Sequence, residues 1–225
     1  MRDLSLVIAK EVGADMLAGS SLRIYGTAYV PQVTNTLGIL PTRNWQTGTF
    51  EGVDTIDGPT LTENYLIKPK PCYRCPIACG RLTEVPDGPY KGKGEGPEYE
   101  TISSFGSGCG VDDLAAVTKA NYWCNELGLD TISAGMTIAA AMEMYEKGYI
   151  PEDDIGQPLR FGDKDAMIEM VQKMAYRDGF GDALAEGSYR LADKYGHPEM
   201  AITTRKQEFP GYDPRGSQGM GLLFA

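Results

Sequence analysis

The sequence predicts a mainly α, multihelical domain that contains one long irregular region. The second half of the 225-residue chain places apolar residues at helical spacing between capping residues. The stretch from about 18 to 110 is instead interrupted by many glycines and prolines, and its strand patterns are few and short. A stretch of this length inside a compact chain is usually functional or held by a cofactor, so we expect a cofactor-binding region there.

Helices are expected in both halves of the chain. Residues 2–17 carry apolar side chains at helical spacing. In the second half, Asp112 or Asp113 can cap a helix that runs to about Leu127, and an apolar helix is expected over 131–147.

Two further helices complete the expected set. Asp163 can cap the first of them, and residues 181–195 are expected to form the second, which ends at Gly196. We interpret the methionines of the first helix as core residues. Its apolar face is formed by Met167, Ile168, Met170, Val171 and Met174.

The composition is that of an ordinary globular protein, with 42% hydrophobic and 23% charged residues. The net charge of −10, from 21 basic and 31 acidic residues, argues against nucleic acid or an anionic membrane as a partner. No stretch approaches the roughly 18 apolar residues of a membrane span, and the first residues lack a signal-peptide pattern. Five cysteines, an odd number, do not fit a secreted disulfide framework, so we expect a cytoplasmic protein.

The most informative segment is the C-x2-C-x3-C run of Cys72, Cys75 and Cys79, followed at once by Gly80 and Arg81. Thiolates are soft ligands, and a short run of them is how a chain surrounds one face of an iron–sulfur cluster. Prolines and glycines on either side allow the backbone to turn around such a group. We therefore expect an electron-transfer site that holds an iron–sulfur cluster.

Other uses of the three thiols fit less well. The bacterial ferredoxin run, C-x2-C-x2-C-x3-C, is absent, and the order is not the C-x3-C-x2-C of radical enzymes that use S-adenosylmethionine. A structural zinc site would need a fourth ligand, but Cys109, Cys124 and the single histidine, His197, form no second pair. Zinc and free thiols remain the alternatives.

A [4Fe–4S] cluster needs a fourth ligand. Cys109 lies in a glycine-rich stretch that could reach the site, whereas Cys124 lies in a helical pattern. Both are more simply interpreted as small buried core residues. We therefore expect the fourth ligand outside this chain.

Beyond the cysteines, the sequence resembles the aldehyde ferredoxin oxidoreductase family, whose members are tungsten or molybdenum pterin enzymes. The resemblance covers nearly the whole chain, and its motifs are specific in combination. They are Y-G-T-A at 25–28, L-P-T-R-N-W at 40–45, F-E-G at 50–52, the segment 72–81, G-P-E-Y-E-T at 96–101, L-G-L-D-T-I-S at 127–133, A-M-E at 141–143 and E-F-P-G-Y-D-P-R-G at 208–216.

The resemblance implies that the chain is an internal part of a longer enzyme. Residues 1–205 would form a helical domain that binds the cluster and pterin, like the family's second domain, and residues 206–225 would begin a further helical domain. Family members also have a β-rich first domain, an active-site histidine and a fourth cluster cysteine, which we expect to lie outside this chain. We expect the chain to be inactive by itself.

Carried over by position, the resemblance implies that Cys72, Cys75 and Cys79 ligate a [4Fe–4S] cluster beside one pterin. Arg81, which follows them, could donate hydrogen bonds to cluster sulfur and raise the reduction potential, or it could pair with an acid.

The segment Asn125-x-x-Gly128-Leu129-Asp130 falls where the family has a D-x-x-G-L-type pterin-binding turn. Here Asn125 replaces the first aspartate, so it can still accept and donate hydrogen bonds but brings no charge. Gly128 is equally expected to end the preceding helix.

Tyr99 and Glu100 resemble the family's active-site pair by position, and Glu98 is the alternative. Oxidation of an aldehyde removes two electrons and passes protons to a base, so a carboxylate with a raised pKa near a metal suits the task. From the residues alone, both glutamates could equally be solvated side chains at a helix start.

The resemblance thus implies an oxidoreductase that converts small aldehydes to carboxylic acids. Electrons would pass through a tungsten or molybdenum bis-pterin and a [4Fe–4S] cluster to ferredoxin or a similar acceptor, and the protein could be a homo-oligomer. Three alternatives remain: a relative that acts on glyceraldehyde-3-phosphate, formaldehyde or the aromatic ring of a thioester; an iron–sulfur electron-transfer module without catalysis; and a zinc-stapled structural domain. Metal content would distinguish the last two from the enzyme.

Overall fold

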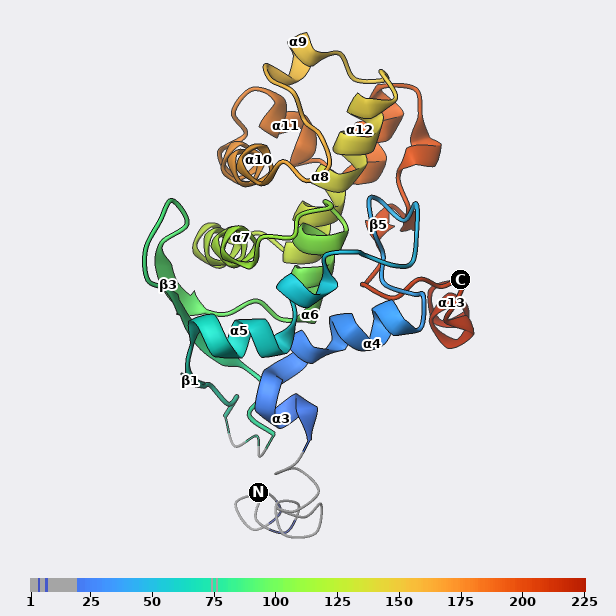
Figure 1. Cartoon of the computed structure of the whole chain (residues 1–225). Coiled ribbons are helices and arrows are strands. Elements are labelled where there is room, and N and C mark those ends of the chain that lie inside the picture. Colours follow the sequence, from blue (N-terminus) through green and yellow to red (C-terminus); the bar gives the residue numbers. More distant parts are fainter. Residues whose placement is uncertain (1–3, 5–6, 8–19, 74, 76) are drawn as a thin grey trace.

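The computed structural model describes residue 4, residue 7 and residues 20–225 except 74 and 76. The helix expected over 2–17 therefore lies outside the described residues, apart from Leu4 and Val7. The described chain has a small sheet and short helices at one end, long helices across the middle and further helices at the other end (Figure 1). The prediction of a mainly α, multihelical fold is confirmed.

Helices account for most of the regular structure in the described residues. The α-helices are α3 (Ser21–Tyr25), α4 (Val30–Thr36), α5 (Gly58–Tyr65), α6 (Tyr99–Thr101), α7 (Leu114–Leu127), α8 (Thr131–Glu146), α9 (Glu152–Ile155), α10 (Lys164–Tyr176), α11 (Phe180–Leu184), α12 (Ser188–Lys194) and α13 (Gln218–Phe224). The shorter turns are the 3-10 helices η1 (Gly26–Tyr29), η2 (Val53–Thr55) and η4 (Pro198–Met200) and the π-helical turn η3 (Ile102–Ser107). The strands are β1 (Leu66–Pro69), β2 (Arg81–Val85), β3 (Gly92–Glu95), β4 (Thr203–Thr204) and β5 (Gln207–Glu208).

Aspartate side chains begin the three long helices. Asp113, Asp130 and Asp163 each accept a hydrogen bond from a backbone N–H in the first turn of α7, α8 and α10, at 3.1, 2.7 and 3.0 Å. Each bond satisfies an N–H that has no partner inside the helix. The capping predictions for α7 and α10 are therefore confirmed.

The helix expected over 181–195 is instead two helices, α11 and α12. They are separated at Gly187, whose φ of 87° is incompatible with a continuing right-handed helix. The spacing of the apolar residues is that of one continuous helix, which is why the sequence predicts a single element. Gly187 interrupts the expected helix and changes the direction of the chain.

The region from 18 to 110 is more regular than the sequence predicts. It contains α3, α4, α5 and a three-stranded antiparallel sheet in the order β1-β2-β3. The expectation of one long irregular region is therefore wrong in part. The segment between β1 and β2, which carries the three clustered cysteines, forms no helix or strand among its described residues.

Strand β3 has the sequence G-K-G-E because its glycines leave room for α7. A Cβ atom on Gly92 or Gly94 would lie 2.8 or 3.0 Å from the ring of Tyr122. The Tyr122 hydroxyl shares a 2.8 Å hydrogen bond with Thr83 Oγ1 on β2. Tyr122 thus packs α7 against the sheet. Because β3 carries glycines in place of β-branched residues, the sequence pattern does not predict this strand.

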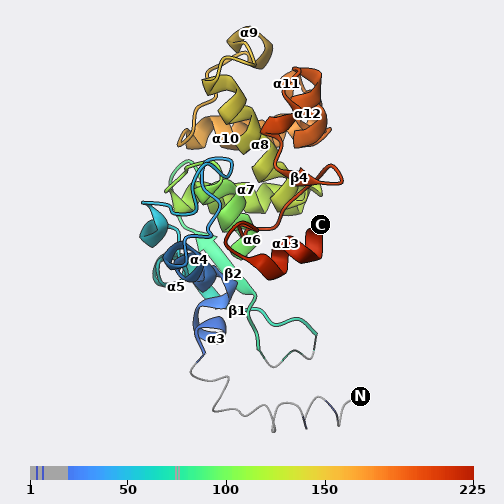
Figure 2. The ribbon, with the colours of Figure 1, turned by 90° about the vertical axis from the view of Figure 1, so that its right-hand side faces the viewer.

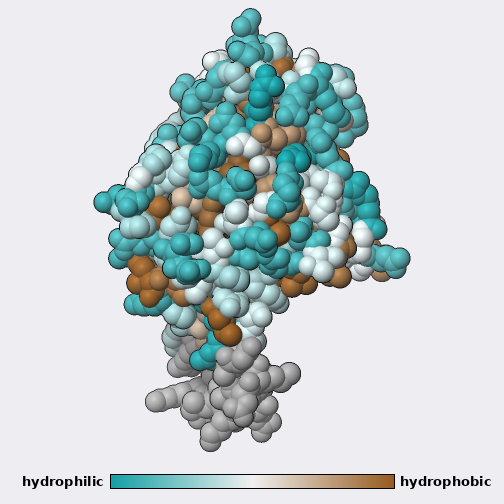
Figure 3. Space-filling model, in the orientation of Figure 1, coloured by the Kyte–Doolittle hydropathy of each residue, from teal (hydrophilic) through white to brown (hydrophobic). Residues whose placement is uncertain are grey.

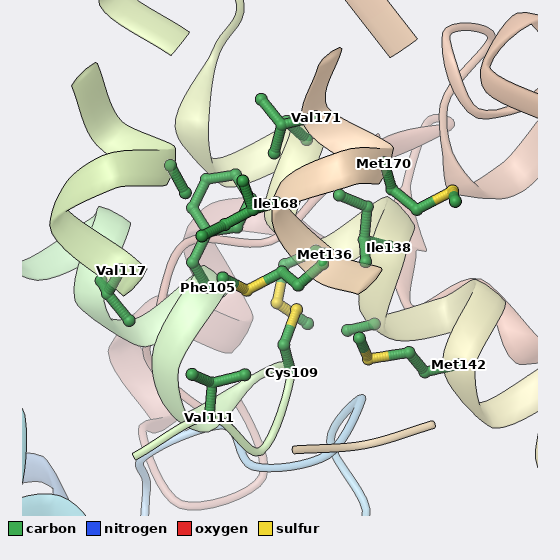
Figure 4. Close-up of a cluster of buried hydrophobic side chains, with 14 of the residues drawn as sticks. Phe105, Cys109, Val111, Val117, Met136, Ile138, Met142, Ile168, Met170 and Val171 are labelled. Atoms are coloured by element: carbon green, nitrogen blue, oxygen red, sulfur yellow. The ribbon is translucent and has the colours of Figure 1, made fainter. Parts of the chain in front are cut away.

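Helix α8 forms the centre of the core. Its residues from 134 to 144 are all buried, and the side chains of Phe105 and Ile138 belong to the cluster around it (Figure 4). Met167 and Met170 on α10 are fully buried, which confirms the interpretation of these methionines as core residues. Fully burying one such side chain stabilises the fold by about 1.5–3 kcal/mol.

Hydrophilic residues predominate on the molecular face in Figure 3, where hydrophobic residues gather only in small patches. Within the described part of the chain, no helix combines the length and the apolar character needed to cross a bilayer.

Candidate functional site

The cysteine loop, residues 70–80, connects β1 to β2 and extends past the end of the sheet (Figure 2). Its two ends are joined by a 2.8 Å hydrogen bond from Lys70 N to Gly80 O, and a 3.0 Å bond from Cys75 N to Cys72 O forms a turn inside it. Cys72 is exposed, and Cys75 and Cys79 are half-buried. The loop therefore presents its thiols at the surface from a closed base.

The three thiols share one electrostatic neighbourhood. Burial raises the pKa of the Cys79 thiol, and the negative charges of Glu98, Cys75 and Cys72 raise it further. A positively charged metal centre would reverse this effect and favour the thiolates. Within the described residues, no three His, Cys, Asp or Glu side chains are gathered around one point as they would be for a single metal ion.

Arg81 anchors the cysteine loop to helix α3. Its side chain is buried, with 3% exposed, and it donates hydrogen bonds to the carbonyl oxygens of Ala78 at 2.8 Å, Gly80 at 3.1 Å and Arg23 at 2.6 Å. Ala78 has a φ of 57°, a left-handed conformation that a non-glycine residue adopts only when its surroundings hold it. Soft thiols in a loop that is anchored by a buried cation suit an anionic iron–sulfur cluster in their chemistry.

The other candidate ligands lie elsewhere. Cys109 is fully buried in the core, where its Sγ donates to Gly135 O at 3.4 Å and burial raises its pKa (Figure 4). Burial raises the pKa of Cys124 to about 12. His197 stacks on the ring of Tyr149, with 3.5 Å between the ring centroids. The interpretation of the two cysteines as core residues is confirmed, and the idea that Cys109 reaches the cysteine loop is wrong.

Thr27 holds the first turn of α6 in place. Its hydroxyl donates to the Glu98 carboxylate and accepts a 2.9 Å hydrogen bond from Tyr99 N. Glu98 is exposed and lies beside the cysteine loop, since its charge acts on both Cys79 and Arg81. Sequence reasoning gave Thr27 no role, although it belongs to the Y-G-T-A motif.

Glu100 faces a different part of the molecule from Glu98. Its carboxylate accepts a 2.7 Å hydrogen bond from Gly211 N, and burial, followed by the negative charge of Asp130, raises its pKa. The Gly211 bond acts in the opposite direction but does not outweigh burial. Tyr99 donates to Gly211 O, and its ring lies 5.0 Å from that of Tyr212. The pair expected at 99–100 is thus assembled with the segment 208–216.

The expected pterin turn joins α7 to α8. Gly128 ends α7 in the left-handed conformation with φ 73° and ψ 33°, Leu129 packs against the core, and Asp130 caps α8. The expectation that Gly128 ends the helix is confirmed, and its place in a pterin-binding turn stays a prediction. Asp130 lines a pocket of about 340 Å³ that also reaches Pro210, next to Gly211. Asn125 is exposed on α7 and lines a different pocket, beside β3.

A strained turn at residues 43–45 contacts the segment 208–216. Arg43, Asn44 and Trp45 have φ values of 46°, 50° and 67°, and each such non-glycine residue costs about 1–3 kcal/mol. Asn44 Nδ2 donates to the buried Glu143 carboxylate at 2.6 Å, and Arg215 Nη2 donates to Trp45 O at 2.7 Å. No local pattern in the sequence predicts this turn, because the groups that hold it come from α8 and from residue 215.

Comparisons with known proteins identify the family of this chain. The family model described as aldehyde ferredoxin oxidoreductase, domains 2 and 3, matches residues 5–225. The tungsten-containing aldehyde ferredoxin oxidoreductase of Thermococcus kodakarensis is 49% identical over 213 residues, which cover 94% of this chain and 35% of that protein. The protein of the same description from Pyrococcus furiosus is 46% identical over 225 residues, which cover 98% of this chain and 37% of that protein. The chain thus spans little more than a third of the length of these relatives.

Among solved structures, the active-site complex BamBC of benzoyl coenzyme A reductase, in complex with 1,5-dienoyl-CoA, has a similar fold. The TM-score is 0.65 at 22% sequence identity, over 82% of this chain and 28% of that chain. At this identity the likeness concerns the fold alone. Because the family model covers nearly the whole sequence and the curated relatives are 46–49% identical, the chain belongs to the aldehyde ferredoxin oxidoreductase family.

Proposed function

We propose that this chain carries the cluster-binding loop and the acid–base carboxylate of an oxidoreductase that converts aldehydes to carboxylic acids. Electrons would pass to ferredoxin or a similar acceptor, which the names of the curated relatives suggest. Residues 1–205 as one domain and 206–225 as the start of another remain a prediction. So do the cytoplasmic location and a homo-oligomeric state.

The observation that carries this proposal is the environment of Glu100. Its carboxylate is half-buried, its pKa is raised, and Gly211 N fixes its orientation. A raised pKa makes a carboxylate a stronger base, so Glu100 would accept a proton more readily than an ordinary glutamate does. Glu98, only two residues away, is exposed and accepts a hydrogen bond from Thr27, so it lacks the burial of Glu100 and its bond from Gly211 N.

The reaction requires a proton acceptor. Conversion of an aldehyde and one water to a carboxylic acid releases two protons and two electrons. A tungsten or molybdenum bis-pterin, when bound, would accept the electron pair. Glu100 would take a proton released at the reacting carbon, and Tyr99 would keep Gly211, and through it the Glu100 carboxylate, in position.

The remaining residues would bind the cofactors. Cys72, Cys75 and Cys79 would supply three thiolates to a [4Fe–4S] cluster, with the fourth ligand outside the described residues. The turn Gly128-Leu129-Asp130 would offer backbone groups and one carboxylate to a pterin, next to the pocket that reaches Pro210. Asn125 lines another pocket, so its contact with a pterin is the weakest part of this assignment.

The test is Glu100→Gln in the purified holoprotein, in the longest form in which it is expressed. Glutamine keeps the shape and the bond from Gly211 N but cannot take a proton. Turnover with a small aldehyde should fall by about 10²–10⁴-fold, while tungsten or molybdenum, pterin and iron stay bound. Tyr99→Phe should lower turnover less, because it removes one hydrogen bond and no proton acceptor.

Glu98→Gln is the matched control, since it makes the same chemical change two residues away at an exposed site. If Glu98→Gln is the damaging variant, the assignment of roles is shifted by two residues. If neither variant matters, the base lies elsewhere. A wild-type protein that contains iron but neither tungsten nor molybdenum would be an electron-transfer module, and one that contains only zinc would be a structural domain.

A further inference from the structure

Arg81 is a buried cation that forms no ion pair with any other residue that the structure describes. Its two terminal nitrogens donate to backbone carbonyl oxygens of the cysteine loop and of α3. The third nitrogen, Nε, is buried and has no hydrogen-bond partner among the described residues.

Burial of the Arg81 guanidinium is energetically unfavourable unless a negatively charged group lies next to it. Burying a charge is costly unless an opposite charge or full hydrogen bonding compensates for it, and buried arginines are normally paired. Carbonyl dipoles compensate for part of the charge here. The Glu98 carboxylate, whose charge acts on Arg81, is exposed and accepts a hydrogen bond from Thr27, and it forms no ion pair with Arg81.

The backbone around Arg81 is shaped to keep the guanidinium in this position. A Cβ atom on Gly26 would lie 3.2 Å from Arg81 Nε and 2.5 Å from Cys79 O. Only a glycine therefore allows η1 to pack against both the arginine and the last cysteine of the loop. The guanidinium is thus held next to the backbone of Cys79, close enough for a negative charge on that thiol to act on it.

We propose that Arg81 is the built-in counter-charge of the anionic cluster bound by Cys72, Cys75 and Cys79, and that it raises the reduction potential of this cluster. The inference rests on the cluster in the proposed function and not on the substrate or the pterin. A thiolate-bound [4Fe–4S] cluster is negative and gains one further negative charge when it accepts one electron. A fixed, buried cation stabilises the reduced state more than the oxidised state, because solvent does not screen it. No bond or proton at Arg81 changes in this step.

The test compares Arg81→Met and Arg81→Lys with the wild-type holoprotein. Iron per protein and the midpoint potential of the cluster are measured by a dithionite titration followed by electron paramagnetic resonance. We expect Arg81→Met to lower the ratio of reduced to oxidised cluster at a fixed potential by at least about tenfold, which is about 59 mV for one electron. Arg81→Lys, which keeps the charge, should stay closer to the wild-type potential.

Lys70→Met is the matched control. Lys70 lies at the base of the same loop, but its side chain is 49% exposed and it pairs with Glu95, so solvent should screen its charge. An equal shift in Lys70→Met and Arg81→Met would overturn the proposal, because burial would then be irrelevant. So would an unchanged potential in an Arg81→Met protein that holds all its iron.

Loss of iron is also decisive. If Arg81→Met loses its cluster while Arg81→Lys keeps it, the charge is what the cluster needs, and the proposal stands. If both variants lose the cluster, the hydrogen-bond geometry of arginine is essential and the counter-charge role is refuted. A wild-type protein without any iron would refute the proposed cluster itself, which is a different result from any of these.

Discussion

Gly26 is the position where a single added methyl group should separate the cysteine loop from the rest of the protein. It is buried, and its φ of 69° and ψ of −165° lie in a region that is essentially restricted to glycine. A Cβ atom there would lie 2.5 Å from Cys79 O, and because this oxygen belongs to the backbone, the clash cannot be relieved by a change of rotamer. Gly26→Ala therefore strains the backbone and pushes the loop away.

The size of the effect follows from these two contributions. A residue in such a sparsely populated conformation costs about 1–3 kcal/mol. Overpacking against fixed atoms adds about 1–3 kcal/mol. The total is about 3 kcal/mol or more, and since 1 kcal/mol shifts the Tm of a chain of this size by about 2–4 °C, we expect Gly26→Ala to lower Tm by about 6–12 °C.

Gly38→Ala is the control that isolates backbone strain. Gly38 has nearly the same φ, 70°, but a Cβ atom there would meet nothing within 4 Å. We expect a loss of about 1–2 kcal/mol from the left-handed conformation alone and no change in iron content. Thermal unfolding followed by circular dichroism, with iron analysis of each protein, measures both effects.

The result that refutes this reasoning is a Gly26→Ala protein that melts within about 2 °C of Gly38→Ala and binds as much iron. The contact of η1 with Cys79 and Arg81 would then not hold the loop. A lower Tm with full iron would mean that the contact stabilises the fold but does not position the thiolates.

Two further predictions concern the same parts of the site. Cys75→Ser should remove the cluster and its visible thiolate-to-iron absorbance, because a hard oxygen ligand binds iron–sulfur poorly; Cys109→Ala, a change in the core, should leave iron per folded protein unchanged, and the reverse pattern would contradict the assignment of ligands. Glu100→Gln should stabilise the protein, because the raised pKa of Glu100 makes the folded state lose stability as pH rises above the ordinary value of 4.5. Urea unfolding should show a larger gain at pH 8 than at pH 5, and an equal gain at both would mean that the pKa of Glu100 is not raised.

The elements that could be predicted from the sequence are those that depend on residues close to one another along the chain. Helices α7 and α10 follow from apolar spacing and from Asp113 and Asp163, whose side chains bond to backbone groups three residues away. The cysteine loop follows from the prolines and glycines around the three cysteines, which also act locally, whereas their role as ligands stays a prediction. Burial of Cys109 and Cys124 follows from the general preference of small apolar side chains for the core.

The parts that could not be predicted depend on distant residues. Strand β3 needs glycines because Tyr122 of α7 lies over it, and the environment of Glu100 needs Gly211, which is 111 residues away. Glu98 and Glu100 have the same chemistry and neighbouring positions in the sequence. What differs is their packing, since Glu98 is exposed whereas Glu100 is half-buried and bonded by Gly211 N.

The short turn η1 connects the two parts of the site. Gly26 packs against Cys79 and Arg81 in the cysteine loop, while its neighbour Thr27 bonds to Glu98 and to Tyr99 N at the start of α6. A displacement of η1 would therefore move the thiols and the Tyr99–Glu100 turn together. Under the proposed function, this turn would hold the three thiols at a constant distance from Glu100, because it contacts the cysteine loop on one side and the start of α6 on the other.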